Sequence, residues 1–277
     1  MLAPGDRGGR SPTRSAFMPS NNNHLAPAVE LLCQAREQQR PLSLSQLAAV
    51  RGPATEEEAY WIQEAVLARL AAGRQQRVSA WKVGAPSREA TPIAAPIADA
   101  LVHPDGARLE GAGFYVIGIE AELAYRFCRD FPARSEAYTP EEVWEGIDGV
   151  CAAIEIVDTR LERWDEAGPW WKLADNQVNG GLVLGSGIDD WQGVDNSRQA
   201  AEQWLNGKRV IARTGSHPLG DPLCLIPWLV NHCTGRQGGL RAGDHVTTGT
   251  WTGMEFVPPG SSVRVCFPGV GEVSVEL

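Results

Sequence analysis

The sequence predicts an α+β protein, in which a helical N-terminal section precedes a mixed, mostly antiparallel, β-rich domain. Apolar residues recur at helical spacing up to about residue 73, and short apolar runs separated by glycine and proline follow from residue 78. Strands and helices do not alternate along the chain, which disfavours a Rossmann or TIM architecture. The expected divisions are a disordered tail (1–20), the helical section (21–77) and the β-rich domain (78–277).

The tail is rich in Gly, Pro, Ser and Arg and contains no apolar run, so it is not a secretory signal. We interpret it either as a disordered extension or as an over-extended start, with Met18 as the real beginning.

Capping residues set the expected helices of the N-terminal section. Ser43 with Gln46, and Thr55 with Glu58, have the spacing of capping boxes. The apolar spacing that follows Thr55 ends at Gly73, a typical helix stop. These signals predict helices that cover another part of the protein.

Local signals also mark the elements of the β-rich domain. Apolar runs predict strands, Asn-Gly predicts a type I′ hairpin, and Thr-Pro or Asp-Pro begins a helix. The expected positions are strands at 78–84, 114–125 and 151–157, a short helix from 139, a hairpin at 206–207, a helix over 221–231 with a kink at Pro227, and β-hairpins in the last 30 residues.

Composition narrows the class of protein. The net charge of −9 and the pI near 5.1 argue against nucleic acid or an anionic membrane as a partner. The six cysteines are scattered without a Cys-x-x-Cys pair, which suits a reducing compartment and predicts a cytoplasmic protein. The five histidines have no ligand spacing, so a zinc site is not expected.

Three glutamates interrupt apolar runs that are typical of buried strands. Glu120 and Glu122 are two residues apart, so their side chains share one face of a strand, and Glu155 lies in a second run. A buried carboxylate is protonated, paired or bound to a cation. Three of them favour a hard divalent cation held by oxygen ligands. The alternative is that Glu120 and Glu122 form the solvated face of a half-exposed strand.

Five segments share their order and approximate spacing with one known family. They are Trp81-Lys-Val-Gly84, Gly118-Ile-Glu-Ala-Glu122, Ala153-Ile-Glu-Ile-Val-Asp158, Leu173-Ala-Asp-Asn176 and Thr248-Gly-Thr250. From about residue 25 to the C-terminus the chain resembles the fumarylacetoacetate hydrolase superfamily, in its 2-keto-4-pentenoate hydratase and 4-oxalocrotonate decarboxylase branch.

The resemblance implies a β-rich roll, a Mg²⁺ or Mn²⁺ cofactor, a homo-oligomer and a small 2-oxo acid substrate. It places the metal ligands on Glu120, Glu122 and Glu155 and the active-site lysine on Lys82. The remaining site residues of the resemblance are Asp175 and Asn176, which line or brace the pocket, and Thr248 and Thr250, which can hydrogen-bond the substrate or simply belong to a hairpin.

The expected function is a metal-dependent hydratase that adds water to a 2-hydroxy-2,4-dienoate or 2-oxo-4-enoate in aromatic catabolism. Lys82, near the cation and partly desolvated, would have a lowered pKa and transfer a proton; its alternative role is to cap a strand end. A 2-oxo acid decarboxylase, a C–C hydrolase, and an inactive metal-binding subunit that partners a paralogous decarboxylase remain as alternatives.

One residue departs from the hydratase pattern. Relatives of that type carry an acid shortly after a proline that follows the lysine motif, whereas this chain has Ile93 after Pro92. If that acid serves acid–base catalysis in the relatives, its absence puts hydration of the usual substrate in doubt.

Overall fold

The computed structural model describes residues 22–72 and 77–277. The predicted tail and the alternative start at Met18 lie outside these residues. Three helices precede the first strand, α1 (Ala26–Gln38), α2 (Leu44–Ala48) and α3 (Glu56–Ala71). Ser43 and Gln46 form the complete capping box at the start of α2. The Thr55 hydroxyl accepts from the Glu58 N–H at 3.2 Å.

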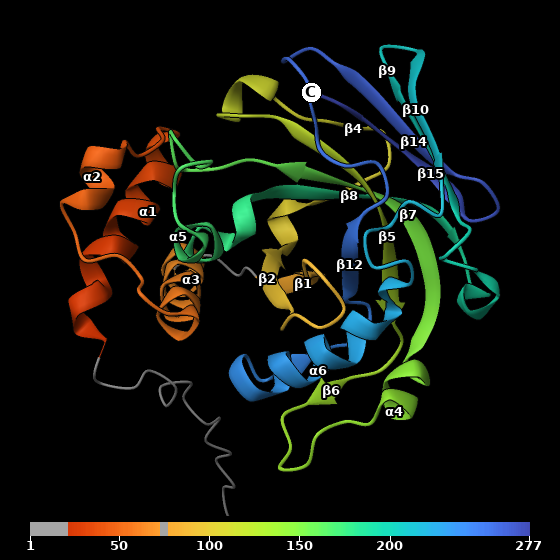
Figure 1. The fold of residues 1–277 in the computed structure, drawn as a ribbon, viewed down its shortest axis with the longest axis horizontal. Coiled ribbons are helices and arrows are strands. Elements are labelled where there is room, and N and C mark those ends of the chain that lie inside the picture. Colours follow the sequence, from red (N-terminus) through yellow and green to blue (C-terminus); the bar gives the residue numbers. More distant parts are fainter. Residues whose placement is uncertain (1–21, 73–76) are drawn as a thin grey trace, which may run out of the picture.

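These helices share a core with a later part of the chain. Leu32 in α1 and Ile62 in α3 are fully buried in one cluster with Leu161 and Leu173. Leu173 lies in the short helix α5 (Pro169–Ala174), which packs beside α3 (Figure 1). The N-terminal helices therefore cover the segment between residues 158 and 179.

A curled, mixed sheet forms the body of the protein (Figure 1). Its strands follow the order β2-β1-β12-β5-β7-β8-β3, and β13 pairs with β5. The β1–β12 and β3–β8 pairs are parallel, and the other pairs are antiparallel. The strands are β1 (Val78–Gly84), β2 (Ile93–Ala98), β3 (Val102–Pro104), β5 (Gly118–Phe127), β7 (Ile147–Val157), β8 (Asn179–Ile188), β12 (His245–Thr250) and β13 (Glu255–Phe256).

The two faces of the curled sheet carry different side chains. Its inner face is lined by small and aliphatic residues, including Ala80, Ala124, Ala153 and Leu182. Because alternate residues of a strand share a face, Lys82, Glu122 and Glu155 point to the same side as these residues. The inner face is thus the place where the candidate site is built.

The outer face of the curled sheet is covered by a second sheet with the order β10-β9-β14-β15-β4. Val263 and Val265 of β14, with Val273 and Val275 of β15, join the main hydrophobic core. The strands are β4 (Ala107–Arg108), β9 (Ala200–Leu205), β10 (Lys208–Thr214), β14 (Ser262–Phe267) and β15 (Gly271–Glu276). The helices α4 (Pro140–Trp144) and α6 (Leu225–Arg236) and the pair β6 (Phe131–Pro132) and β11 (Gly239–Leu240) complete the protein.

Most local predictions are confirmed, with two corrections. Asn206 and Gly207 both have positive φ (50° and 78°) and connect β9 to β10, as an Asn-Gly hairpin requires. The expected kink at Pro227 is wrong, because α6 begins at Leu225 and Pro227 falls in its first turn. There an N–H would have no partner within the helix, so proline is tolerated.

The strand predicted from residue 114 begins later, at Gly118. The N–H groups of Tyr115 and Val116 donate to Asp158 Oδ1 at 3.0 and 3.1 Å. The Asp158 side chain is thus their acceptor, in place of the carbonyl groups of a neighbouring strand.

All six cysteines are free thiols. None of the helices in the described residues is both long and apolar enough to cross a membrane.

Candidate metal centre and active site

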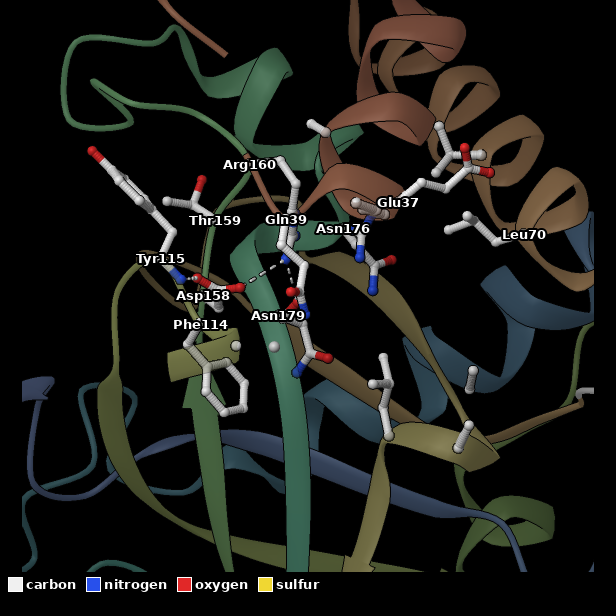
Figure 2. Close-up of a pocket in the computed structure, with 18 of the residues that line it drawn as sticks. Glu37, Gln39, Leu70, Phe114, Tyr115, Asp158, Thr159, Arg160, Asn176 and Asn179 are labelled. Carbon is white, nitrogen blue, oxygen red and sulfur yellow. Dashed lines mark hydrogen bonds and ion pairs between the residues drawn. The ribbon is translucent and has the colours of Figure 1, made fainter. Parts of the chain in front are cut away.

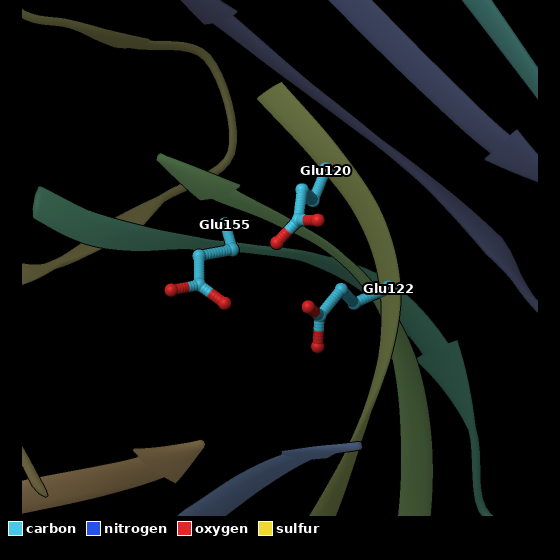
Figure 3. A group of neighbouring side chains, drawn as sticks. All are labelled: Glu120, Glu122 and Glu155. Carbon is cyan, nitrogen blue, oxygen red and sulfur yellow. The ribbon is translucent and has the colours of Figure 1, made fainter. Parts of the chain in front are cut away.

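The three glutamates meet on the inner face of the curled sheet (Figure 3). In the antiparallel pair of β5 and β7, Glu120 stands directly opposite Glu155. Glu122 follows two residues later on β5 and therefore faces the same side. One carboxylate oxygen of each residue lies within 4.8 Å of the others. The strand register alone thus brings together the residues that the sequence singled out.

The carboxylates are partly held by the surrounding backbone and side chains. Gly249 N–H donates to Glu122 Oε2 at 3.0 Å, and Asn179 Nδ2 donates to Glu155 Oε1 at 2.9 Å. Gly249 has φ of +102° at the point where the β12–β5 register shifts, a backbone conformation that favours glycine. Glu155 Oε2 is buried without a hydrogen-bond partner in the described part of the chain.

Burial and mutual repulsion disfavour the charged forms of two of these glutamates. Burial, with the negative charge of Glu155, raises the pKa of Glu120 to about 7 and that of Glu122 well above its usual range. Glu122 is 2% exposed and Glu155 is fully buried. Three close carboxylates with an unpartnered oxygen need positive charge beside them. This donor set, made only of oxygen, fits a hard divalent cation.

Lys82 on β1 supplies one positive charge. Its Nζ contacts Glu155 Oε1 and donates to the backbone carbonyl of Gln177 at 3.2 Å. Burial opposes the charged ammonium, but the negative charges of Glu155, Glu120 and Glu122 outweigh it and raise the pKa of Lys82. The lowered pKa of Lys82 that the sequence predicts is therefore not found when only the three carboxylates surround its ammonium group. A cation between them would oppose this effect, because it would neutralise the same charges.

The carbonyl that holds Lys82 belongs to an unusual turn. Asn176, Gln177 and Val178 have φ of 59°, 50° and 54°, three successive left-handed residues. This conformation is unfavourable for residues with a Cβ and most of all for a β-branched valine. The Asn176 amide Nδ2 ties the turn to β2 by donating to the Pro96 carbonyl at 2.9 Å. The turn therefore joins the β2 strand to the lysine.

The Asp175 carboxylate is held by other groups of the protein. Its side chain is fully buried. It accepts from Arg160 Nε at 2.5 Å, from the Thr159 hydroxyl at 3.0 Å and, more loosely, from Arg36 at 3.4 Å. These contacts support the bracing role, one of the two roles that the resemblance left open.

The two threonines on β12 differ from each other. Thr248 is 1% exposed, and its Oγ1 has no hydrogen-bond partner in the described residues. Thr250 lies opposite Glu122, and its hydroxyl donates to the Gly253 carbonyl at 3.3 Å. Thr248 thus retains a polar group without a partner in the described residues, whereas Thr250 belongs to the local turn.

Two residues of the site were missed by the sequence analysis. Asn179 contacts Glu155 through its amide, and Gln177 contacts Lys82 through its backbone carbonyl. Asn179 lies three residues after Asn176, and a polar residue at the start of an apolar strand was its only signal. A backbone carbonyl has no sequence signal.

Ile93 does not bring a carboxylate to this site. It begins β2, pairs with Gly84 and packs beside the core of the N-terminal helices. The acid that the hydratase pattern has at this point is therefore missing from β2 in the structure as well.

Comparison with known proteins agrees with this geometry. Residues 70–277 match the fumarylacetoacetate (FAA) hydrolase C-terminal family. The chain is 32% identical to the 2-keto-4-pentenoate hydratase of Paraburkholderia xenovorans (strain LB400) over 159 residues, which is 57% of this chain and only 58% of that hydratase. It is 31% identical to 2-keto-4-pentenoate hydratase 2 of Dechloromonas aromatica (strain RCB) over 270 residues, which cover 91% and 98% of the two chains.

A solved structure shows the same fold. The 4-oxalocrotonate decarboxylase from Pseudomonas putida G7, complexed with magnesium and adipate, superposes with a TM-score of 0.78. The sequences are 24% identical, and the match covers 94% of this chain and 99% of that chain. The predicted α+β, β-rich fold with N-terminal helices is thereby confirmed.

Proposed function

This chain belongs to the fumarylacetoacetate hydrolase family, and on that premise we propose that it is a divalent-metal-dependent hydratase. Its substrate would be a 2-hydroxy-2,4-dienoate or the corresponding 2-oxo-4-enoate, produced in the breakdown of aromatic compounds. The two relatives described above, both named 2-keto-4-pentenoate hydratase, support this reaction class.

One observation carries the proposal, the contact between Lys82 and Glu155 within the group of three carboxylates. It places a proton-carrying amine directly beside a site for a hard cation. Glu120, Glu122 and Glu155 would hold the cation, and their oxygen-only donor set favours Mg²⁺ or Mn²⁺. When bound, such an ion supplies Lewis-acid stabilisation of negative charge that develops on the substrate oxygen.

Lys82 would carry the proton in this reaction. Hydration places a hydroxyl group on one carbon of a double bond and a proton on another carbon, so a group must move protons beside the substrate. The Gln177 carbonyl, at 3.2 Å, would fix the position of Nζ. The buried Thr248 hydroxyl, which has no partner in the described residues, supports a hydrogen bond to the substrate carboxylate.

Activity assays test the proposal. The purified protein would be assayed with 2-hydroxypenta-2,4-dienoate and with 4-oxalocrotonate, each with Mg²⁺ and with a chelator. We expect Mg²⁺-dependent loss of the dienoate absorbance, and a turnover that is about 10²–10⁴-fold slower after Lys82→Met. Turnover that survives complete chelation would contradict a metal-dependent hydratase.

Decarboxylation of a 2-oxo acid is the second candidate, and Ile93 favours it. No acidic side chain occupies β2, and loss of CO₂ does not require a base that activates water. Release of CO₂ from 4-oxalocrotonate without hydration of the dienoate would replace the first candidate by this one. Failure of both substrates would favour the inactive metal-binding subunit.

A further inference from the structure

A large cavity lies outside the metal centre. It encloses about 630 Å³, and neither Lys82 nor the three glutamates line it. Its walls come from α1, α3, the β2 edge and the start of β8, so it lies between the N-terminal helices and the curled sheet (Figure 2). This volume is in the range of small-molecule sites.

Two arginines at the inner wall of this cavity share one carboxylate. Arg160 takes the close contacts with Asp175, at 2.5 Å to Oδ1 and 2.7 Å to the backbone carbonyl. Arg36 keeps a single contact with Asp175 at 3.4 Å, and its buried Nε has no partner in the described chain. Burial and the positive charge of Arg160 lower the pKa of Arg36 to about 10. Arg36 is thus a poorly compensated cation on the cavity wall.

The acidic groups nearby compensate Arg36 only in part, since Asp175 and Asp158 raise its pKa less than burial and Arg160 lower it. Asp158 Oδ2 is 3.8 Å from Arg160 Nη1, and Asp158 Oδ1 accepts from two backbone N–H groups. Glu37 and Glu110 are exposed at the rim, as is Arg40. A ligand carboxylate could bind the free Nε and the adjacent Nη of Arg36 in the bidentate manner that guanidinium favours.

The rest of the lining is suited to an apolar chain. Leu67, Leu70 and Phe114 contribute apolar surface, and Leu70 and Phe114 are drawn in Figure 2. We propose that this cavity is a second binding site, which takes a small carboxylic acid with an apolar chain and needs no metal.

The occupant of this second site would be coupled to the metal centre through Asn179. The Asn179 carbonyl accepts from Arg160 at 3.1 Å, and its side-chain amide donates to Glu155 at 2.9 Å. A ligand that shifts Arg160 therefore changes a contact of a candidate metal ligand. Such coupling would be reciprocal, so the ligand would change the affinity for the cation and the cation would change the affinity for the ligand by the same factor.

Hexanoate is a suitable probe, because it has one carboxylate, an apolar chain and no 2-oxo group for chelation. Calorimetric titration of the full chain in the presence of a chelator should show saturable binding. Arg36→Met should weaken it about tenfold or more, the usual effect of losing a charged hydrogen bond. Arg40→Met at the exposed rim is the matched control and should change the affinity for hexanoate by less than about twofold.

A second variant covers the case in which Arg36→Met fails to fold. Leu70→Trp would narrow the cavity without changing any charge, and it should also weaken hexanoate binding. Absence of saturable binding to the wild type, or unchanged binding after both substitutions, would overturn the proposal. The titration uses no metal and reads no activity, so its failure would leave the proposed hydratase reaction untouched.

The coupling is tested by titrating Mn²⁺ into the wild type with and without saturating hexanoate. We expect hexanoate to change the Mn²⁺ Kd about threefold or more in the wild type and to leave it unchanged in Arg36→Met. An identical Kd in the wild type under both conditions would refute the link through Asn179.

Discussion

At the scale of single residues, Lys82 is the side chain whose removal separates proton transfer from cation binding. Lys82→Met keeps the aliphatic stem and removes the ammonium beside Glu155. We expect kcat to fall by about 10²–10⁴-fold, the usual effect of losing an acid–base group. Mn²⁺ affinity should be retained or slightly increased, because a neighbouring positive charge is lost.

The control for this substitution is Lys208→Met on the exposed strand β10, which should leave both quantities unchanged. A near-normal kcat with a much higher KM in Lys82→Met would instead assign Lys82 to substrate binding.

The sequence predicts some residues of the site better than others. Glu120, Glu122 and Glu155 were predictable, because a carboxylate in an apolar strand is a local anomaly and strand alternation gives its direction. The contacts of Asp175 were not predictable, because its partners Arg36 and Arg160 lie 139 and 15 residues away along the chain. The contact between Lys82 and Gln177 spans 95 residues and ends on a backbone carbonyl.

At the scale of elements, the left-handed turn at residues 176–178 is the segment that positions Lys82. Val178 has φ of 54° and is only partly buried. In this conformation a residue with a Cβ is less favourable by roughly 1–2 kcal/mol, and glycine removes that penalty.

We therefore expect Val178→Gly to unfold with a free energy equal to that of the wild type or about 1 kcal/mol higher. Urea denaturation measures this quantity. The matched control is Val210→Gly on β10, where the side chain is exposed and φ is not positive; it should be destabilised by about 1 kcal/mol. A destabilisation of several kcal/mol in Val178→Gly would show that the valine side chain, and not backbone strain, dominates at this position.

Elements with short-range signals were predictable, and those defined by distant contacts were not. The capping box at Ser43 and the hairpin at Asn206-Gly207 depend only on neighbouring residues. The start of β5 depends on Asp158, which binds the N–H groups of Tyr115 and Val116 from 43 and 42 residues away. No local pattern contains that information.

At the scale of the whole molecule, two half-buried histidines link stability to pH. Burial and the positive charge of Arg236 lower the pKa of His232 to about 4, and burial with Arg126 does the same for His245. An unfolded histidine titrates near about 6.5, so the unfolded state binds protons first as pH falls. These residues therefore contribute full stability above pH ~6.5 and lose it between about 6.5 and 4.

We expect the free energy of unfolding to fall in that window by up to about 1.4 kcal/mol per pH unit for each histidine. His232→Phe keeps an aromatic ring beside Trp228, which stacks on His232 with ring centres 4.7 Å apart. In this variant, the free energy of unfolding should change less steeply with pH than in the wild type. The difference corresponds to about one proton fewer taken up on unfolding. Equal slopes in chemical denaturation at pH 7, 6, 5 and 4.5 would contradict this assignment.

The resemblance of five short segments gave the overall fold, but not the way its layers meet. The joint core of Leu32, Ile62 and Leu173 connects the N-terminal helices to a segment more than 100 residues later. Each helix shows only its own apolar stripe in the sequence, and its partner is not specified. The cavity between these layers was unpredictable for the same reason.

Calorimetric titration of Mn²⁺ into the wild type and Glu155→Gln tests the central claim, that the three glutamates hold a divalent cation. Glutamine keeps the volume of the fully buried side chain and removes its charge. We expect the affinity to fall by about 100-fold or more, since even partners outside the ligand set change affinity by about 10–100-fold. Glu145→Gln, at the exposed end of α4, should bind as the wild type does. Unchanged Mn²⁺ affinity in a folded Glu155→Gln protein would contradict the account.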